Sequence, residues 1–268
     1  MLNKIGIIPL GQSRRRAAFS PLSLSPVLWL NFSDISTLFT DSAGTIPVTA
    51  DGDVIGYAAD KSGNGNHATQ ATTLNKPLWK AAIQNGLGAG LWDGSNDYLL
   101  MPRVLAQADT SYTQVLVAKL QSPFSALRLV FQQVPTAQSS GAPFSHSIQL
   151  TTTPLFRADT FPPSGGTFNS ATVSTGTRLA SYIQGGTSQE WRVDGASSST
   201  GSGGETYSCV TAINQAVLGV YLNMDNLPPT TVFPYAGHIC EFLVFSESLD
   251  AGQLEQLETY LNDKWNIY

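Results

Sequence analysis

The sequence predicts an all-β sandwich, closed by one α-helix at the C-terminus and preceded by an extended N-terminal arm. Charged residues make up only 12% of the 268 residues and hydrophobic residues 42%, so small uncharged side chains supply most of the polarity. Short apolar runs alternate with turn residues along most of the chain, and apolar residues at helical spacing occur only near its end. This mixture is typical of short strands joined by many turns.

The arm covers residues 1–26, where prolines and glycines interrupt regular structure. Two interpretations are open: a disordered leader, or an anchor whose apolar residues join an assembly while its arginine triplet pairs with an acidic partner surface. The anchoring residues would be Ile5, Ile7, Ile8, Leu10, Arg14, Arg15 and Arg16. The rest, 27–268, fits one domain, because β-sandwiches reach this length as single units.

Strands are expected where an apolar run of strand length is bounded by turn residues. The first lies at 27–32 and is followed by one helical turn at 34–38. Later strands are expected at 98–101, 112–120, 127–132, 147–150, 180–184, 190–193, 217–221 and 238–245. The dipeptide Asp194-Gly195 is a hairpin-type turn.

The last strand is expected to be central in its sheet, because both of its faces are mostly apolar. Strict alternation places Cys240 with Phe242 on one face and Ile239 with Glu241 on the other. Long polar loops are expected at 134–144, 160–169, 196–206 and 223–234. Of these, the Ser/Gly-rich segment 196–204 has the composition of a flexible linker.

One helix is expected at 250–265. Asp250 can cap it, and Gln253 stands three residues on, as in a capping box. Apolar residues then recur at helical spacing and form one stripe that should lie on the sandwich. The stripe is Leu254, Leu257, Leu261 and Trp265.

Two stretches carry a resemblance to a known family. They read Asp60-Lys-Ser-Gly-Asn-Gly-Asn-His-Ala-Thr-Gln70 and Gly90-Leu-Trp-Asp-Gly-Ser-Asn-Asp-Tyr-Leu-Leu100. The glycine and asparagine residues of the first require tight turns. Together they resemble the W/A-x-D-x-S-G-N-G-x-x-A-T and F-x-G-x-x-D-Y-L signatures of laminin-G-like, concanavalin A-like lectin domains. The opening Leu28-Trp-Leu-Asn-Phe32 departs from that family's Leu-Trp-Leu-Asp-Ala, with Asn31 in place of the aspartate.

The resemblance implies a concanavalin A-like, laminin-G-like jelly-roll β-sandwich. Such domains are found in bacterial surface proteins and in structural proteins of tailed bacteriophages. We therefore expect a non-enzymatic virion protein, a capsid decoration, head fibre or tail-associated protein, whose arm binds other virion proteins. The first alternative is a bacterial surface or secreted carbohydrate-binding adhesion module, and the second is a glycoside hydrolase of the sandwich superfamily.

Partners and location follow from charge and from what the chain lacks. A formal net charge of −5 argues against a nucleic-acid partner. No apolar run is long enough for a membrane span, and no secretory signal is recognisable. We expect assembly in a host cytoplasm, display on a virion surface and a homo-oligomer, with an extracellular location as the alternative. Cys209 and Cys240 are expected to be buried free thiols, with one disulfide as the alternative.

Catalysis is not expected. The Glu-x-Asp-x-Glu pattern that the resemblance would imply for sandwich glucanases is missing. The nearest pair, Glu190 and Asp194, would lie about 13 Å apart along a strand, which is too far for paired-carboxylate hydrolysis. His67, His146 and His238 lie singly, in loops or at a strand start, so no metal or catalytic motif includes them.

Calcium is not required, but the resemblance implies a candidate site near a loop rim. Asp60, Asn64, Asn66, Asp93 and Asp97 supply the oxygen donors that calcium prefers. The competing interpretation is that these side chains stabilise their own turns through bonds to the backbone.

A host-surface glycan would be bound by loop aromatics stacked on sugar rings, with polar groups beside them. The candidates are Phe144, Phe161, Phe168, Asn169, Tyr207, Asn223 and Asp225. Contact with a neighbouring protein explains the same aromatics equally well. The five tryptophans fall in strands or in the helix stripe and are assigned to the core.

Overall fold

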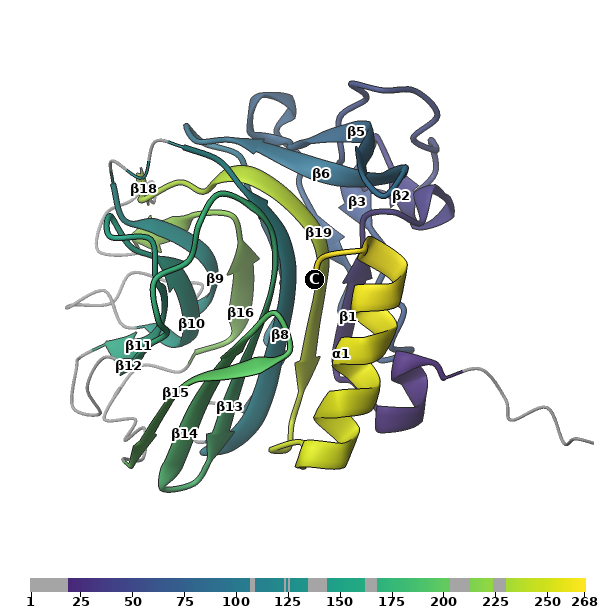
Figure 1. Cartoon of the computed structure of the whole chain (residues 1–268). Coiled ribbons are helices and arrows are strands. Elements are labelled where there is room, and N and C mark those ends of the chain that lie inside the picture. Colours follow the sequence, from purple (N-terminus) through teal and green to yellow (C-terminus); the bar gives the residue numbers. More distant parts are fainter. Residues whose placement is uncertain are drawn as a thin grey trace, which may run out of the picture.

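The computed structural model describes residues 19–106, 109–122, 124, 126–134, 144–161, 168–202, 213–223 and 230–268. Two antiparallel sheets face each other, and one α-helix lies on the outer side of the first (Figure 1). The predicted fold class is confirmed. No helix in the described ranges is long and apolar enough to cross a membrane.

The first sheet, sheet A, has eight strands, and the second, sheet B, has nine. In spatial order, sheet A consists of β15 (Ala196–Ser202), β14 (Ser188–Val193), β13 (Gly176–Gly185), β8 (Ser111–Leu120), β19 (Ala236–Phe245), β6 (Leu87–Asp93) and β5 (Leu78–Gln84), with β1 (Leu28–Asn31) also paired to β19. Sheet B consists of β12 (Phe168–Asn169), β11 (Phe156–Phe161), β10 (Phe144–Leu150), β9 (Arg128–Val134), β16 (Gln215–Leu218), β7 (Leu99–Pro102), β4 (Ala68–Thr69), β3 (Tyr57–Ala58) and β2 (Leu38–Phe39).

Shorter elements complete the described chain. They are the 3₁₀ turns η1 (Pro21–Leu24), η2 (Ile35–Thr37) and η3 (Thr73–Asn75), the hairpin of β17 (Tyr221–Asn223) with β18 (Thr230–Val232), and the helix α1 (Ala251–Trp265). The turn η2 confirms the helical turn expected after the first strand.

Two hydrophobic clusters hold these layers together. The larger fills the space between the sheets, where Phe131 of β9 packs against Phe242 of β19 with ring centroids 4.9 Å apart. The smaller lies between sheet A and α1 and contains the whole predicted stripe of the helix, from Leu254 to Trp265, all buried. Strand β19 is therefore covered on both faces, as the sequence predicts.

The start of α1 also follows the prediction. The Asp250 carboxylate accepts a hydrogen bond from the Gln253 backbone N–H at 2.9 Å, and the Gln253 side chain accepts one from the Asp250 N–H at 2.8 Å. This capping box satisfies two donors that a helix start leaves without partners. It fixes the point at which the chain leaves sheet A and turns back across it.

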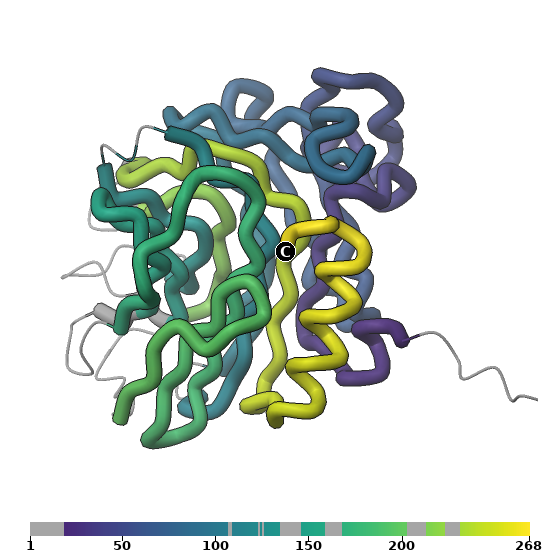
Figure 2. Tube along the Cα trace, in the orientation of Figure 1, coloured from purple at the N-terminus to yellow at the C-terminus, as the bar shows by residue number. Residues whose placement is uncertain are grey.

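Only residues 19–26 of the predicted arm are described, and they lie against the domain. Pro21 is buried, and Phe19 packs on Tyr260 of α1 with ring centroids 5.7 Å apart. Figure 2 shows the purple N-terminal turn beside the yellow helix. The predicted anchoring residues from Ile5 to Arg16 lie outside the described residues.

Two of the expected strands differ in detail from the structure, and one loop connects the two sheets. A β-bulge between Ile239 and Glu241 breaks the alternation, so Ile239 faces the inter-sheet core and Cys240 faces the helix. The expected strand 217–221 is split into β16 and β17 at Gly219. The φ of this residue is +106°, which glycine adopts without steric strain. The loop after Asp93-Gly94 joins β6 of sheet A to β7 of sheet B, so it bridges the two layers.

The segment expected to be flexible, 196–204, contains β15 over Ala196–Ser202, and that expectation was wrong for these residues. Asp194 and Gly195 adopt φ of +51° and +77°, which is the geometry of a tight hairpin turn. The turn directs the chain back along β14, where the two strands pair from Val193↔Ala196 to Ser188↔Ser202. Backbone pairing orders a segment whose composition alone suggests disorder.

Candidate functional site

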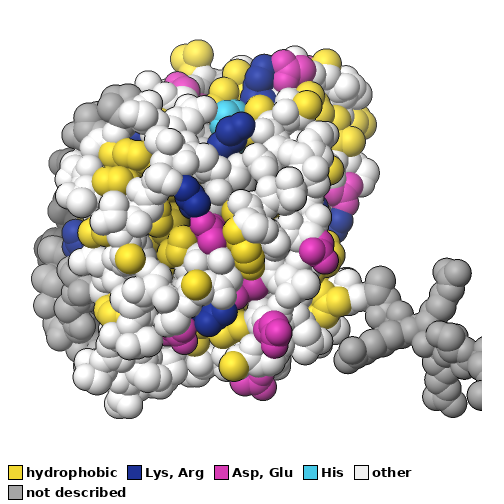
Figure 3. All heavy atoms as spheres, in the orientation of Figure 1, with side chains coloured by type: hydrophobic (Ala, Val, Ile, Leu, Met, Phe, Trp, Pro, Cys, Tyr) yellow, Lys and Arg dark blue, Asp and Glu magenta, His cyan; other side chains and the backbone are white. Residues whose placement is uncertain are grey.

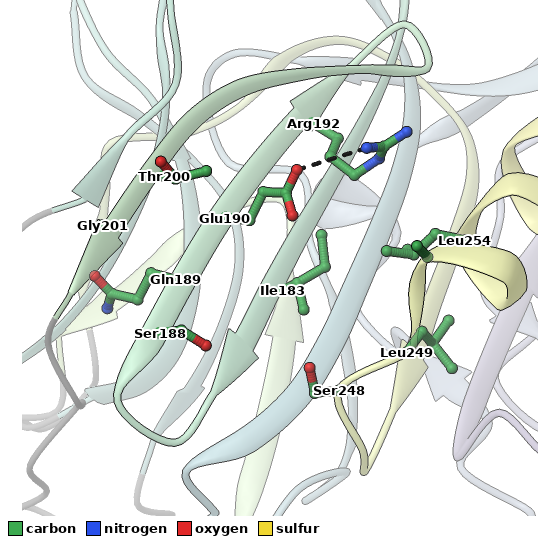
Figure 4. A pocket seen from close by; sticks show the side chains of 11 residues that line it. Ile183, Ser188, Gln189, Glu190, Arg192, Thr200, Gly201, Ser248, Leu249 and Leu254 are labelled. Atoms are coloured by element: carbon green, nitrogen blue, oxygen red, sulfur yellow. Dashed lines mark ion pairs between the residues drawn. The ribbon is translucent and has the colours of Figure 1, made fainter.

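A pocket of about 300 Å³ opens on the outer face of sheet A, beyond the first turn of α1 (Figure 4). We call it the outer-face pocket. Its lining residues are Ile183, Ser188, Gln189, Glu190, Arg192, Thr200, Gly201, Ser248, Leu249, Ala251 and Leu254. The face that carries α1 and β13–β15 is shown in Figure 3, where acidic, basic and hydrophobic side chains lie close together.

Strand alternation places the charged residues of β14 in this pocket. Trp191 points inward and is fully buried, with its ring 5.8 Å from that of Phe156. Its neighbours Glu190 and Arg192 therefore point outward. In sheet A, Glu190 lies between Ile183 of β13 and Thr200 of β15, which are its cross-strand partners.

Arg192 is held firmly by the helix. Its Nε donates to both Glu258 carboxylate oxygens at 3.0 and 3.1 Å, and its Nη2 donates to Glu258 Oε2 at 2.9 Å and to the Gly195 carbonyl at 2.8 Å. Glu258 is buried and also accepts from the Ser181 hydroxyl at 2.8 Å. The hydrogen bonds to Glu258 raise the pKa of Arg192 above its usual value. The remaining Nη1 faces Glu190, at 3.5 Å from Oε1.

Glu190 is the acidic group that the pocket offers to solvent, since its side chain keeps 30% of its accessible surface. The hydroxyl groups of Ser188, Thr200 and Ser248 also line the pocket, and one wall is formed by the largely buried apolar side chains of Ile183, Leu249 and Leu254. A ligand here would meet hydrogen-bonding groups on one side and hydrocarbon on the other. Sugars present that combination, because they carry hydroxyl groups around an apolar ring face.

Glu190 and Asp194, the nearest pair of carboxylates in the sequence, belong to two different ion pairs. Glu190 faces Arg192, whereas Asp194 lies in the hairpin turn, where its carboxylate contacts Arg178 Nη1 at 2.6 Å and accepts from the Leu179 N–H at 3.0 Å. Asp194 therefore stabilises the turn.

Comparison with solved structures places this fold. Similar to it are a Trypanosoma rangeli sialidase in complex with 2,3-difluorosialic acid (TM-score 0.59, 11% identity, 96% of this chain and 36% of that one) and the receptor-binding domain of botulinum neurotoxin D (0.56, 9%, 90% and 54%). A third is domain 4 of AbnA, a GH43 extracellular arabinanase from Geobacillus stearothermophilus, in complex with arabinotriose (0.52, 13%, 87% and 98%). The chain is a lectin-like β-sandwich.

At these identities the likeness shows the fold alone. This chain spans about a third of the sialidase chain that it matches, 36%, but nearly the whole of the arabinanase domain, 98%. No protein-family model matches the chain, and no curated protein matches it.

Only part of the predicted glycan set can be placed. The Phe168 ring is partly buried, 6.3 Å from that of Tyr182, and so belongs to core packing rather than to an exposed loop. Asn169 is exposed on β12, and its carbonyl accepts from the Ser199 hydroxyl. Phe144, Phe161 and Asn223 are strand residues of β10, β11 and β17, with side chains outside the described part. Tyr207 and Asp225 lie outside the described residues.

The first part of the predicted calcium set is engaged in its own turn. The Asp60 carboxylate accepts from the backbone N–H groups of Trp29, Ser62 and Asn66 at 2.9–3.0 Å. The side-chain amides of Asn64 and Asn66 donate to the carbonyls of residues 26 and 27 at 3.1 and 2.8 Å. These contacts tie the turn to the start of β1 through side-chain to backbone bonds.

Asp93 and Asp97 form a separate pair at the bridge between the sheets. Asp97 Oδ2 accepts from the Asp93 N–H at 2.9 Å, and Asp93 Oδ1 accepts from the Ser95 N–H at 2.8 Å. Burial raises the pKa of Asp97 to about 6, and the Asp93 charge adds to the rise. Among the described residues no three His, Cys, Asp or Glu side chains are grouped to hold a metal ion. Calcium binding stays a prediction.

The histidines and cysteines have structural surroundings. His146 is fully buried within β10, not in a loop or at a strand start as expected. Its Nδ1 lies 3.0 Å from Gln133 Nε2 and its Nε2 lies 3.1 Å from the Asp109 carbonyl, so the ring is neutral with its proton on Nε2. Cys240 is a buried free thiol, and Cys209 lies outside the described residues.

The outer-face pocket was not foreseen from the sequence. Its members come from β13, β14, β15, the turn before α1 and the first turn of α1 itself. These segments are brought together by tertiary contacts that no local pattern specifies. One signal was present: in Gln189-Glu-Trp-Arg192 the charged residues alternate with a tryptophan. That alternation indicates a strand with one buried and one exposed face, and it directs Glu190 and Arg192 to the same surface.

Proposed function

We propose that this chain is a non-catalytic carbohydrate-binding domain and that the outer-face pocket is its glycan site. The observation that carries the proposal is the make-up of the pocket. One partly exposed carboxylate, Glu190, lines the same pocket as three hydroxyl groups and an apolar wall. Sugar sites combine a few fixed polar groups with apolar surface in the same way.

The size of the pocket supports a short ligand. Its volume of about 300 Å³ is at the lower end of the range for small-molecule sites. We expect one sugar unit to enter it while the rest of the glycan stays in solvent. The fold adds support, because a sandwich of this kind, arabinanase domain 4, has been solved with arabinotriose.

The non-catalytic part of the proposal rests on the charges of the site. Glu190 is the one acidic side chain among the described lining residues, and Arg192 faces it. Hydrolysis by the common mechanisms needs a second carboxylic group on the other side of the scissile bond. The test is incubation of the full-length protein with polysaccharides and measurement of reducing-sugar release, and a sustained release would reject this part.

Binding is tested on a glycan array with the full-length protein and three variants. Glu190→Gln and Thr200→Val change polar groups of the pocket, while Glu255→Gln makes the same chemical change as the first on the exposed face of α1. We expect binding by the natural protein and by Glu255→Gln, and weaker binding by both pocket variants. Binding that neither pocket variant alters would place the glycan site elsewhere.

A role as a virion protein, anchored through the N-terminal arm, is a further part of the proposal and stays a prediction. Its support is the sequence resemblance together with the apolar and basic composition of residues 1–18. Because Pro21 and Phe19 pack on the domain, the deletion that tests it should stop at residue 18. We expect that deletion to leave the melting temperature unchanged and to abolish incorporation into particles, and unchanged incorporation would reject the anchor.

A further inference from the structure

We propose that the outer-face pocket selects an uncharged sugar unit and discriminates against sugars that carry a carboxylate. This inference rests on the proposed function and specifies its ligand class. It follows from how the charges of the site are already paired.

Arg192 is the one cationic side chain among the described lining residues, so it would have to receive a carboxylated sugar. Its Nε and Nη2 are occupied by Glu258, and Nη2 also by the Gly195 carbonyl. Its remaining nitrogen, Nη1, faces Glu190. One guanidinium therefore stands between two carboxylates, and the group carries a net charge of −1.

Arg192 cannot readily leave this arrangement for a ligand. Glu258 is only 2% exposed, and without Arg192 it would be a buried carboxylate with the Ser181 hydroxyl as its remaining described partner. An uncompensated buried charge is strongly unfavourable. The guanidinium is thus a fixed part of the wall rather than a mobile anion clamp.

A ligand consequently meets an excess of hydrogen-bond acceptors at the open end of the pocket. The Glu190 carboxylate accepts but cannot donate, and the Ser188 hydroxyl already donates to the Gly185 carbonyl at 3.2 Å. The hydroxyls of Thr200 and Ser248 can donate or accept. Sugar hydroxyl groups supply the matching donors without adding charge. A sialic acid or uronic acid would instead bring a second negative charge next to Glu190, and like charges at contact distance repel.

The test uses ligand pairs that differ in one acidic unit: lactose against 3′-sialyllactose, and a neutral oligosaccharide against its uronic acid counterpart. Dissociation constants are measured with the full-length protein by titration calorimetry at low and at physiological salt. We expect the neutral member of each pair to bind about tenfold more tightly or better at low salt, with the ratio shrinking as salt screens the charges.

The variants separate charge from shape. Glu190→Gln should lower affinity for the neutral sugar and reduce the discrimination, because the charge is removed and the size is kept. Glu255→Gln, which removes one charge on the exposed face of α1, should change neither quantity. Thr200→Val should weaken the binding of both sugars of a pair by the same factor.

The outcomes distinguish this inference from the proposed function. Equal or tighter binding of the acidic sugars would overturn the charge argument while leaving a glycan-binding domain. Preference for a cationic amino sugar over its N-acetyl form would agree with the charge argument but would overturn the uncharged ligand class that we propose. If no sugar of either pair and no glycan on the array binds, both this inference and the proposed function would be overturned.

Discussion

Two carboxylates on the same outer face of sheet A differ in burial and in hydrogen-bond partners. Glu241 of β19 lies beneath α1 with no exposed surface, and it accepts hydrogen bonds from the indoles of Trp29 and Trp265, at 2.6 and 2.9 Å, and from Lys264, at 2.6 Å. Glu190 of β14 lies beyond the helix and faces Arg192 alone among the described residues. The covered carboxylate joins three elements together, whereas the open one keeps oxygen lone pairs for a ligand.

The comparison shows that the position of α1 divides the sheet into a structural part and a surface available for binding. Beneath the helix, every oxygen of Glu241 and Glu258 has a donor. Beyond the N-terminal end of the helix, the Glu190 side chain keeps 30% of its surface exposed. Glu-to-Gln substitutions on the two sides should therefore have different effects, on stability beneath the helix and on ligand affinity beyond it. Four measurements test this difference.

The largest effect is expected for Glu241→Gln. The new amide N–H₂ would point at an indole N–H or at the Lys264 ammonium, so one buried donor loses its acceptor and the lysine loses its counter-charge. Removing one partner of a buried ion pair costs about 3–5 kcal/mol. Urea unfolding of the variant and the natural protein measures this loss, and a cost below about 1 kcal/mol would contradict the account.

The sandwich interior provides a second enclosed polar group, His146, and a pH test. Burial lowers the pKa of His146 to about 3, well below its value of about 6.5 in an unfolded chain. The unfolded state therefore takes up the proton first, so the stability that this residue contributes is complete above pH 6.5 and is lost as the pH falls toward 3. The loss should be about 1.4 kcal/mol per pH unit.

Unfolding free energies between pH 7 and pH 4 measure this slope. The variant His146→Gln keeps one donor and one acceptor but does not titrate in this range. The slope of its unfolding free energy with pH should therefore be smaller by about 1.4 kcal/mol per pH unit. Parallel curves for the two proteins would mean that His146 does not carry the pH dependence.

A smaller effect is expected for Glu258→Gln, at the boundary between the covered and open parts. Glutamine can accept from the Ser181 hydroxyl but cannot hold Arg192 through two charged oxygens. We expect a loss of about 2 kcal/mol, typical of hydrogen bonds to charged groups. The same variant should also free Arg192, so binding of acidic sugars, measured by calorimetry, should improve relative to the natural protein.

The smallest effect on stability is expected for Glu190→Gln. Its ion pair is long, at 3.5 Å, and both side chains are partly exposed, so the unfolding free energy should change by less than about 0.5 kcal/mol. Its effect belongs to ligand affinity instead. A large loss of stability in thermal or urea unfolding would show that the open part of the sheet is as structural as the covered part.

Local patterns predicted the elements whose signals lie within one segment. The capping box and apolar stripe of α1, the Asp194-Gly195 turn and the central position of β19 were all readable, because each depends on spacing within a few residues. The bulge at Cys240 could not be predicted in this way. One extra residue reverses which face of the sheet the preceding side chains occupy, and it leaves no mark in the composition. The order of β15 came from pairing with β14, which no property of its own residues specifies.

The site was harder to predict than the fold for the same reason. The pocket combines β13, β14, β15, the turn before α1 and the first turn of α1. Its chemistry also depends on Glu258, a helix residue that does not line the pocket. Loop aromatics were expected to stack on sugar rings, whereas Phe168 is partly buried and packs against the core. A rule based on alternating charged and aromatic residues along one strand would have found Glu190 and Arg192.

Strand β15 forms one edge of sheet A with small residues, Ala196-Ser-Ser-Ser-Thr-Gly-Ser202, and without the lysine or proline that natural edge strands use against unwanted strand addition. Its serines supply another protection. The Ser198 hydroxyl accepts from the Ala171 N–H and the Ser199 hydroxyl donates to the Asn169 carbonyl, both at 2.7 Å, which holds residues 169–171 along this edge. Replacing these two serines with alanine would remove both hydrogen bonds to residues 169–171, and we expect the variant to be more prone to intermolecular β-pairing at this edge.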